Sequence, residues 1–312
     1  IINLLTSELT KAGVVLELGT VFEAVEKSDD GFAVRLSSGP LTCSSFIVAT
    51  GGKSIPKMGA TGLGYTLAQQ FGLRVTETRP ALVPLTFEPR ILERLGALSG
   101  ISTEAIATAN GKSFREALLF THRGLSGPAI LQISSYWREG DPISLDLAPT
   151  FSVTDVLAEA RRATPRLSLQ TVLAAQLPKR LAQMLAEDIA LGGILGDFSD
   201  AKIAKVAAHL GRWTIKPTGT EGFRTAEVTL GGVDTRDLDS TTLAARRVPA
   251  AIKFCGPGHR AGPPGRLPDR QTGARMQHRP GAAAWRSKIL CRPGDCPAQW
   301  QPRTILGRRA HS

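Results

Sequence analysis

A short apolar run that ends in small residues and glycines most constrains how this chain can fold. Phe46-Ile47-Val48 has the composition of a buried strand, and it runs directly into Ala49-Thr50-Gly51-Gly52-Lys53-Ser54. A helix is expected over residues 61–72, and its start contains Gly62 and Gly64. A strand, a glycine-rich turn and a helix N-terminus together offer backbone amides to a phosphate. The pattern favours a nucleotide-binding α/β fold, although a plain strand-turn-helix connection has the same glycine spacing equally often.

The other expected elements alternate between strands and helices. Short apolar runs with a turn at Asp29-Asp30-Gly31 predict a meander of strands over residues 14–48. Asn110-Gly111 predicts a second hairpin, residues 154–210 have helical patterns, and residues 213–233 return to strand. The order predicts a Rossmann-like sheet that is interrupted by a strand-plus-helix insertion and then resumes.

The positive charge of the chain lies at its C-terminal end. The formal net charge is +11, yet residues 251–312 hold 12 of the 38 Lys and Arg and only two of the 27 acidic residues, Asp269 and Asp295. Residues 1–250 therefore carry 26 basic and 25 acidic side chains. The few apolar residues of the terminal segment follow no helical or strand period, so the segment cannot bury a core. We expect residues 250–312 to be a poorly ordered basic tail.

Several classes of protein are disfavoured. No apolar run approaches the ~18 residues of a spanning helix, so no membrane span is expected. The start of the chain has no signal-peptide pattern and the four cysteines give no disulfide framework, which favours a reducing, cytoplasmic location. Cys291 and Cys296, with His278 and His311, have spacing that is weak for zinc, so no metal site is predicted.

Two other functions fit parts of the sequence. An arginine-rich, acid-depleted tail is typical of proteins that bind nucleic acid or an anionic surface. A noncatalytic nucleotide binder would use the same glycine-rich turn. Because the first 250 residues are nearly neutral, nucleic acid is the less favoured partner and a small-molecule substrate is expected.

Five segments, taken together and in order, resemble a known family. They are Ala49-Thr50-Gly51-Gly52-Lys53-Ser54, Thr61-Gly62-Leu63-Gly64-Tyr65, Thr121-His122-Arg123-Gly124-Leu125-Ser126-Gly127-Pro128, Lys216-Pro217 and Ala226-Glu227-Val228-Thr229-Leu230-Gly231-Gly232-Val233. The chain resembles the HI0933-like, or BaiN-like, bacterial FAD-dependent oxidoreductases over residues 1–249. An ordered set of this size is far more specific than any one of its members.

The resemblance implies an FAD-binding enzyme with an inserted β-barrel-like and helical domain. It would pass a hydride from NAD(P)H through the flavin to an organic acceptor, by analogy a conjugated double bond. The residues implied to bind the cofactor are Thr50, Gly51, Gly52, Ser54, Gly62, Gly64, Gly231, Gly232 and Val233. Residues 121–128 would face the cleft from the insertion, with His122 a hydrogen-bonding residue rather than a general base. The resemblance nominates no catalytic acid or base.

Two departures from the family pattern bear on cofactor binding. The Gly-x-Gly-x-x-Gly turn that opens such a fold is not found, so the chain is expected to start downstream of it. The resemblance also stops after Arg247-Val248-Pro249, which suggests a shift of reading frame near Pro249. The expected organisation is therefore a partial FAD/NAD(P)-binding domain, the insertion, a return to the first domain and an out-of-frame tail, over residues 1–75, 76–212, 213–249 and 250–312. Such a fragment is expected to bind FAD poorly.

Overall fold

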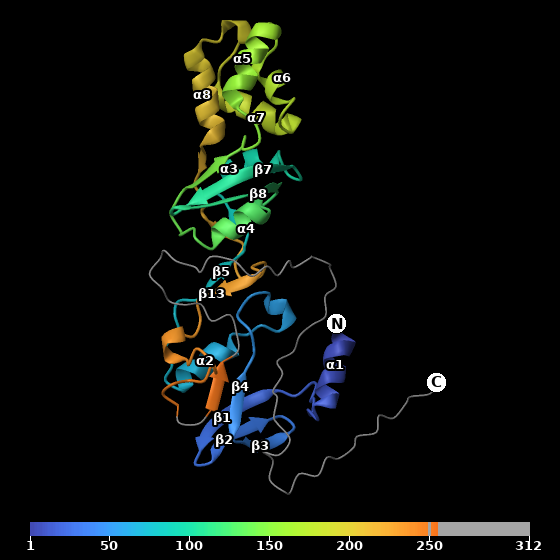
Figure 1. Ribbon diagram of the computed structural model, residues 1–312, viewed down its shortest axis with the longest axis vertical. Coiled ribbons are helices and arrows are strands. Elements are labelled where there is room, and N and C mark those ends of the chain that lie inside the picture. The colour runs from blue at the N-terminus through green and yellow to red at the C-terminus, as the bar shows by residue number, and fades with distance from the viewer. Residues whose placement is uncertain (249–250, 255–312) are drawn as a thin grey trace, which may run out of the picture. The chain divides into compact units, whose positions relative to one another are not determined.

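The computed structural model describes residues 1–248 and 251–254 of the chain (Figure 1). Two compact units make up this part. Unit 1 comprises residues 1–52, 57–77 and the described residues from 231 onward, and unit 2 comprises residues 53–56 and 78–230. The chain therefore returns to unit 1 after Leu230, whereas the sequence placed this return at Trp213.

Unit 1 is a mixed α/β unit built on short strands. Its elements are α1 (Ile2–Lys11), β1 (Phe22–Ser28), β2 (Gly31–Leu36), β3 (Gly39–Cys43), β4 (Ser45–Val48), η1 (Pro56–Met58), α2 (Leu63–Gln70), η3 (Thr235–Asp237) and β14 (Ala251–Phe254). The first residue of η1, Pro56, belongs to unit 2. β1, β2 and β3 form an antiparallel sheet, and the hairpin predicted at Asp29-Asp30-Gly31 is confirmed. Residues 14–20 form no strand, contrary to the predicted meander.

The expected buried strand is β4, and it pairs in parallel with β14. Phe46 lies opposite Ile252 and Val48 opposite Phe254, and all four side chains are buried. The pair extends four residues past the break that the sequence placed after residue 250. Residues 255–312, which include Cys291 and Cys296, lie outside the described residues. The structure therefore does not test the hypothesis of a shifted reading frame in this segment.

Unit 2 is centred on a seven-stranded antiparallel sheet with the order β11-β10-β7-β8-β9-β6-β12. These strands are β6 (Leu85–Thr86), β7 (Ser102–Ala109), β8 (Lys112–Thr121), β9 (Gly124–Ser126), β10 (Ile143–Asp146), β11 (Trp213–Ile215) and β12 (Gly219–Thr220). β5 (Arg79–Ala81) and β13 (Val228–Leu230) form a separate antiparallel pair. The hairpin predicted at Asn110-Gly111 is confirmed, with φ of 48° and 73° at the two positions.

The helices of unit 2 cover the sheet and form a helical part of their own. They are α3 (Pro89–Gly96), α4 (Pro128–Ser134), α5 (Val153–Ala163), α6 (Leu169–Leu173), α7 (Lys179–Ile189), η2 (Leu195–Asp197) and α8 (Asp200–Gly211). The Ser152, Ser168 and Ser199 hydroxyls each accept the amide three residues ahead, which caps α5, α6 and α8. The helical pattern predicted for residues 154–210 is therefore confirmed. Across the described residues, no helix is both long enough and apolar enough to cross a membrane.

Four charged residues connect the segment after α2 to η3 within unit 1. Asp237, which is 4% exposed, accepts from the backbone amide of Arg74 at 2.9 Å and from its guanidinium at 3.1 and 3.2 Å. Asp234, which is 1% exposed, accepts from the Arg236 guanidinium at 2.6 to 3.1 Å. The hydrogen bonds from Arg236 lower the pKa of Asp234 to about 2, and those from Arg74 lower the pKa of Asp237.

These pKa shifts predict that acid weakens unit 1. A carboxyl group with a lowered pKa stabilises the fold above its ordinary pKa and loses that contribution as the pH falls toward its folded value. The stability of the protein should therefore decline from about pH 5 toward pH 2. Asp237→Asn should cost on the order of 1–2 kcal/mol at neutral pH, because solvent screens the half-exposed Arg74, and urea unfolding monitored by circular dichroism measures this cost.

The cost of Asp237→Asn should shrink as the pH falls through the titration of Asp237. Glu23→Gln is the control, because Glu23 meets Arg35 in an exposed ion pair at 3.4 Å and should change stability little. A cost of Asp237→Asn that is the same at pH 3 and pH 7 would contradict the assignment.

Candidate functional site

The turn after β4 packs directly on the start of α2. Gly64 lies so close to β4 that an added Cβ would come within 2.7 Å of the Thr50 Oγ1 and 3.3 Å of Val48. Gly62 precedes the helix with φ of 78° and without a side-chain cap. Gly51 has φ of 73°, and the position of its missing Cβ is open space. Open backbone beside an uncapped helix start is the kind of cradle that the diphosphate of a dinucleotide requires.

The segment that follows is anchored by a threonine that the sequence did not single out. Thr229 lies on β13, is 1% exposed, and accepts hydrogen bonds from the backbone amides of Lys53 at 2.8 Å and Ser54 at 3.1 Å. Its hydroxyl also lies 3.0 Å from the Ser54 Oγ. The Ser54 hydroxyl, which was predicted to lie near a dinucleotide, is thus placed against Thr229. Lys53 and Ser54, the last residues of the motif at 49–54, thus lie against β13, which belongs to the motif at 226–233.

The Gly231-Gly232-Val233 segment is placed against residues 75–77 within unit 1. Gly231 has φ of 83°, and a Cβ there would overlap the carbonyl oxygen of Glu77. The Gly232 amide donates to the Thr76 Oγ1 at 3.0 Å, and the Thr76 amide donates to the Gly232 carbonyl at 2.8 Å. Val233 pairs with Val75 in an isolated bridge. The close crossing of two chain segments is therefore a sufficient reason for Gly231, and the flavin contact stays a prediction.

The motif at residues 121–128 forms a tight hairpin turn between β8 and β9. Thr121 pairs with Gly124, which leaves His122 and Arg123 exposed at the tip. A Cβ on Gly124 would overlap the carbonyl oxygen of Leu85, and one on Gly127 would come within 2.6 Å of another backbone oxygen. Packing thus accounts for the two glycines of this motif but not for its histidine and arginine.

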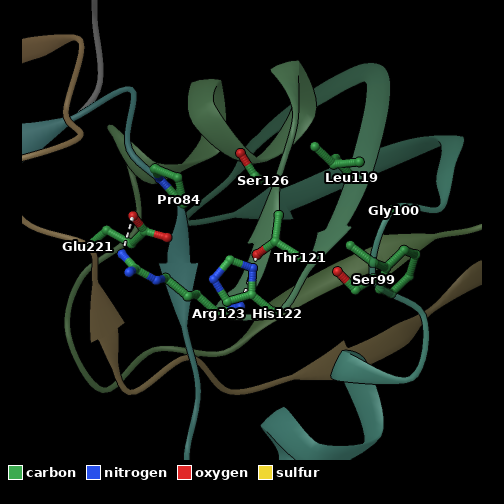
Figure 2. A pocket seen from close by; sticks show the side chains of 10 residues that line it. Pro84, Ser99, Gly100, Leu119, Thr121, His122, Arg123, Ser126 and Glu221 are labelled. Atoms are coloured by element: carbon green, nitrogen blue, oxygen red, sulfur yellow. Dashed lines mark hydrogen bonds and ion pairs between the residues drawn. The ribbon is translucent and has the colours of Figure 1, made fainter.

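His122 and Arg123 line an open hollow of about 440 Å³ on unit 2 (Figure 2). The hollow is lined by Pro84, Ser99, Gly100, Leu119, Phe120, Thr121, His122, Arg123, Ser126 and Glu221. Figure 2 shows Glu221 beside Arg123, and the Arg123 Nη1 lies 3.6 Å from the Glu221 Oε2. The Glu221 side chain is only 12% exposed. Sequence analysis missed Glu221, which lies in no motif and reaches the hollow through the fold.

The helical part of unit 2 supports the rim of this hollow. The guanidinium of Arg180, at the start of α7, donates to the carbonyl of Ala97 at 2.7 Å and to that of Ser99 at 3.4 Å. The loop that carries Ser99 is therefore held by a residue far along the chain. Among the described residues, no three His, Cys, Asp or Glu side chains are grouped as metal ligands would be.

Comparison with known proteins identifies the class of unit 2. Residues 79–228, nearly all of this unit, match the family described as the HI0933-like protein barrel and H2TH domain. The seven-stranded sheet corresponds to the expected barrel-like part, and the match supports the resemblance to HI0933-like proteins.

Individual relatives extend the similarity beyond unit 2. The chain is 44% identical over 265 residues to the "Ribosomal RNA dihydrouridine synthase" of Escherichia coli (strain K12), and 40% identical over 262 residues to the protein of that name from Haemophilus influenzae. It is 27% identical over 269 residues to the "3-dehydro-bile acid delta(4,6)-reductase" of Clostridium scindens. These alignments cover 82%, 82% and 79% of this chain but only 64%, 65% and 63% of the relatives. The chain thus spans just under two thirds of their length, and the relatives carry the names of oxidoreductase enzymes.

Replacing Gly231 tests the close crossing in unit 1. Gly231→Ala should destabilise the protein by about 2 kcal/mol or more beyond Gly51→Ala, because both positions have positive φ but only Gly231 faces a backbone oxygen. Thermal and urea unfolding of the two variants measure this difference. Equal costs for the two substitutions would show that the crossing is looser than described.

The hydroxyl of Thr229 is tested by an isosteric change. Thr229→Val should cost about 2 kcal/mol, because it leaves two backbone amides without their acceptor in a shielded place. Thr214→Val is the matched control, since Thr214 is exposed and its hydroxyl donates to the nearby Arg212 carbonyl at 3.3 Å. If both variants unfold at the same urea concentration as the unchanged protein, Thr229 is not the anchor.

Proposed function

We propose that this chain is part of a flavin-dependent oxidoreductase that reduces a uridine of ribosomal RNA to dihydrouridine. The 44% identity over 265 residues to the Escherichia coli ribosomal RNA dihydrouridine synthase is the observation that carries the proposal. The match of residues 79–228 to the HI0933-like barrel and H2TH domain agrees with it. An enzyme with this substrate works in the cytoplasm, in agreement with the location expected from the sequence.

The proposed reaction fits the acceptor that the sequence led us to expect. Dihydrouridine is uridine whose C5=C6 double bond is saturated, and that bond is conjugated with the C4 carbonyl. One hydride and one proton add across it, so that NAD(P)H, a proton and uridine give NAD(P)⁺ and dihydrouridine. A bound flavin supplies the hydride-transfer chemistry between nicotinamide and acceptor.

Residues at the β4 turn are suited to hold FAD. Thr50, Gly51 and Gly52 follow the strand, and Gly62 and Gly64 shape the uncapped start of α2. The open backbone at Gly51 supports this assignment.

A second group of predicted cofactor residues is held by the protein's own contacts. These are Ser54 on Thr229 and Gly231, Gly232 and Val233 on residues 75–77. We propose that they orient the backbone next to the cofactor, with the flavin ring approaching Gly231, Gly232 and Val233.

A second candidate is the reduction of a small conjugated ketone. It agrees with the small-molecule partner expected from the sequence, and the 27% identity to the Clostridium scindens reductase supports it. The higher identity to two proteins named for ribosomal RNA favours the RNA substrate. RNA as substrate departs from the sequence-based preference against nucleic acid.

Deleting the gene in the organism that encodes the chain tests the RNA substrate. Ribosomal RNA from the deletion strain should lack dihydrouridine at a uridine that carries it in the parent, and a plasmid copy of the gene should restore it. Mass spectrometry of nuclease-digested ribosomal RNA measures both results. An unchanged dihydrouridine content in the deletion strain would reject the RNA substrate and favour the small-molecule reductase.

A further inference from the structure

We infer that the hollow on unit 2 binds the uridine to be reduced by its imide edge, with Glu221 accepting from the base N3–H and Arg123 donating to a neighbouring carbonyl oxygen. This inference rests on the proposed function, whose substrate is a uridine in RNA. It assigns the recognition of the base to the hairpin turn at His122 and Arg123 and to Glu221.

The state of Glu221 is the first reason. Its side chain is 12% exposed, and among the described residues the contact recorded for its carboxylate is the 3.6 Å ion pair with Arg123. That separation is too long for a hydrogen bond. The Glu221 carboxylate lines the open hollow, so it has acceptor capacity that a ligand can use without breaking a hydrogen bond within the protein. A donor supplied by a ligand in the hollow would satisfy it.

The chemistry of the pair is the second reason. A carboxylate beside a guanidinium presents an acceptor next to a fork of donors. The imide edge of uracil presents the reverse, an N3–H donor flanked by carbonyl oxygens. Cytosine presents an unprotonated N3 at the same place, which a carboxylate repels. The Glu221 and Arg123 pair therefore distinguishes uracil from cytosine by hydrogen bonding.

The form of the hollow is the third reason. Its lining includes the exposed His122 and Arg123 and the buried Phe120. In uracil, the C5=C6 bond lies on the side of the ring opposite N3. A base held by its imide edge against Glu221 and Arg123 thus keeps the reactive double bond on the side of the ring away from this pair. His122, exposed at the tip of the turn, offers a ring on which a base can stack without regard to its identity.

Binding of short labelled RNAs tests this assignment without bound flavin. The probes are fluorescein-labelled pentamers of uridine, of cytidine and of N3-methyluridine, and fluorescence polarisation at one fixed salt concentration gives their affinities. Contacts to phosphates cancel from the ratio of affinities because the three probes have the same length. The unchanged protein should prefer the uridine pentamer roughly tenfold over the other two, as expected for one good polar base contact.

Three variants separate the roles. Glu221→Gln should reduce the preference for uridine to within about twofold, whereas His122→Ala should weaken all three probes by the same factor. Glu104→Gln is the matched control, because Glu104 forms a similar ion pair with Arg115 at 2.6 Å outside the hollow and should keep the preference.

Two results would overturn the assignment. Equal affinities of the unchanged protein for uridine and N3-methyluridine pentamers would show that N3–H is not recognised. An unchanged preference in Glu221→Gln would show that Glu221 does not recognise it. If the deletion strain loses dihydrouridine and either of these results is found, the assignment of the uridine site is rejected and the proposed function stands. Failure of the binding site is thus distinguishable from failure of the proposed function.

Discussion

The buried hydroxyl of Thr229 is the contact that holds residues 53–54 on β13 within unit 2. It receives the backbone amides of Lys53 and Ser54, which lie more than 170 positions away in the sequence. This one side chain therefore fixes a short segment of unit 2 against a strand of the same unit. The Thr76 and Gly232 pair performs the same task within unit 1. The hydroxyls of Thr229 and Thr76 thus hold chain segments together at places where the strands, such as the three-residue β13, are short.

The glycines of the five motifs serve two physical purposes. Gly124, Gly127 and Gly231 occupy places where a Cβ would meet backbone atoms, so the fold alone requires them. Gly51 has no such neighbour, and its backbone stays open. The φ of 73° at Gly51 is itself a reason for glycine, and the open backbone there leaves room for a ligand. In the motif at residues 121–128, packing likewise explains Gly124 and Gly127 but does not explain the exposed His122 and Arg123.

Local patterns in the sequence predicted the local elements well. The Asn110-Gly111 hairpin, the helices of residues 154–210 and the strand before Thr50 each follow from turn chemistry or from periodicity. Long-range pairing was not predictable in this way. β11 and β12 have three and two residues, which is too short for a hydrophobic period to appear. Their pairing with β10 and β6 is what assigns them to the seven-stranded sheet.

The candidate site was predictable to the extent that a motif marked it. Residues 121–128 were singled out, and the structure places Thr121, His122, Arg123 and Ser126 at one hollow. Glu221 and Thr229 gave no comparable signal on their own, because the role of each depends on which distant segment lies beside it. Glu221 is one of two acidic residues between the lysine-proline pair and the glycine pair, and it is unremarkable until the sheet brings it to Arg123.

The proposed reaction is the saturation of a uridine in RNA. Ribosomal RNA that lacks dihydrouridine, incubated with NAD(P)H and protein purified from its own organism, tests it most directly by mass spectrometry of the RNA fragments. One uridine should gain two hydrogen atoms, and omission of NAD(P)H should abolish this gain. RNA that remains unchanged while the same preparation reduces a small conjugated ketone would contradict it.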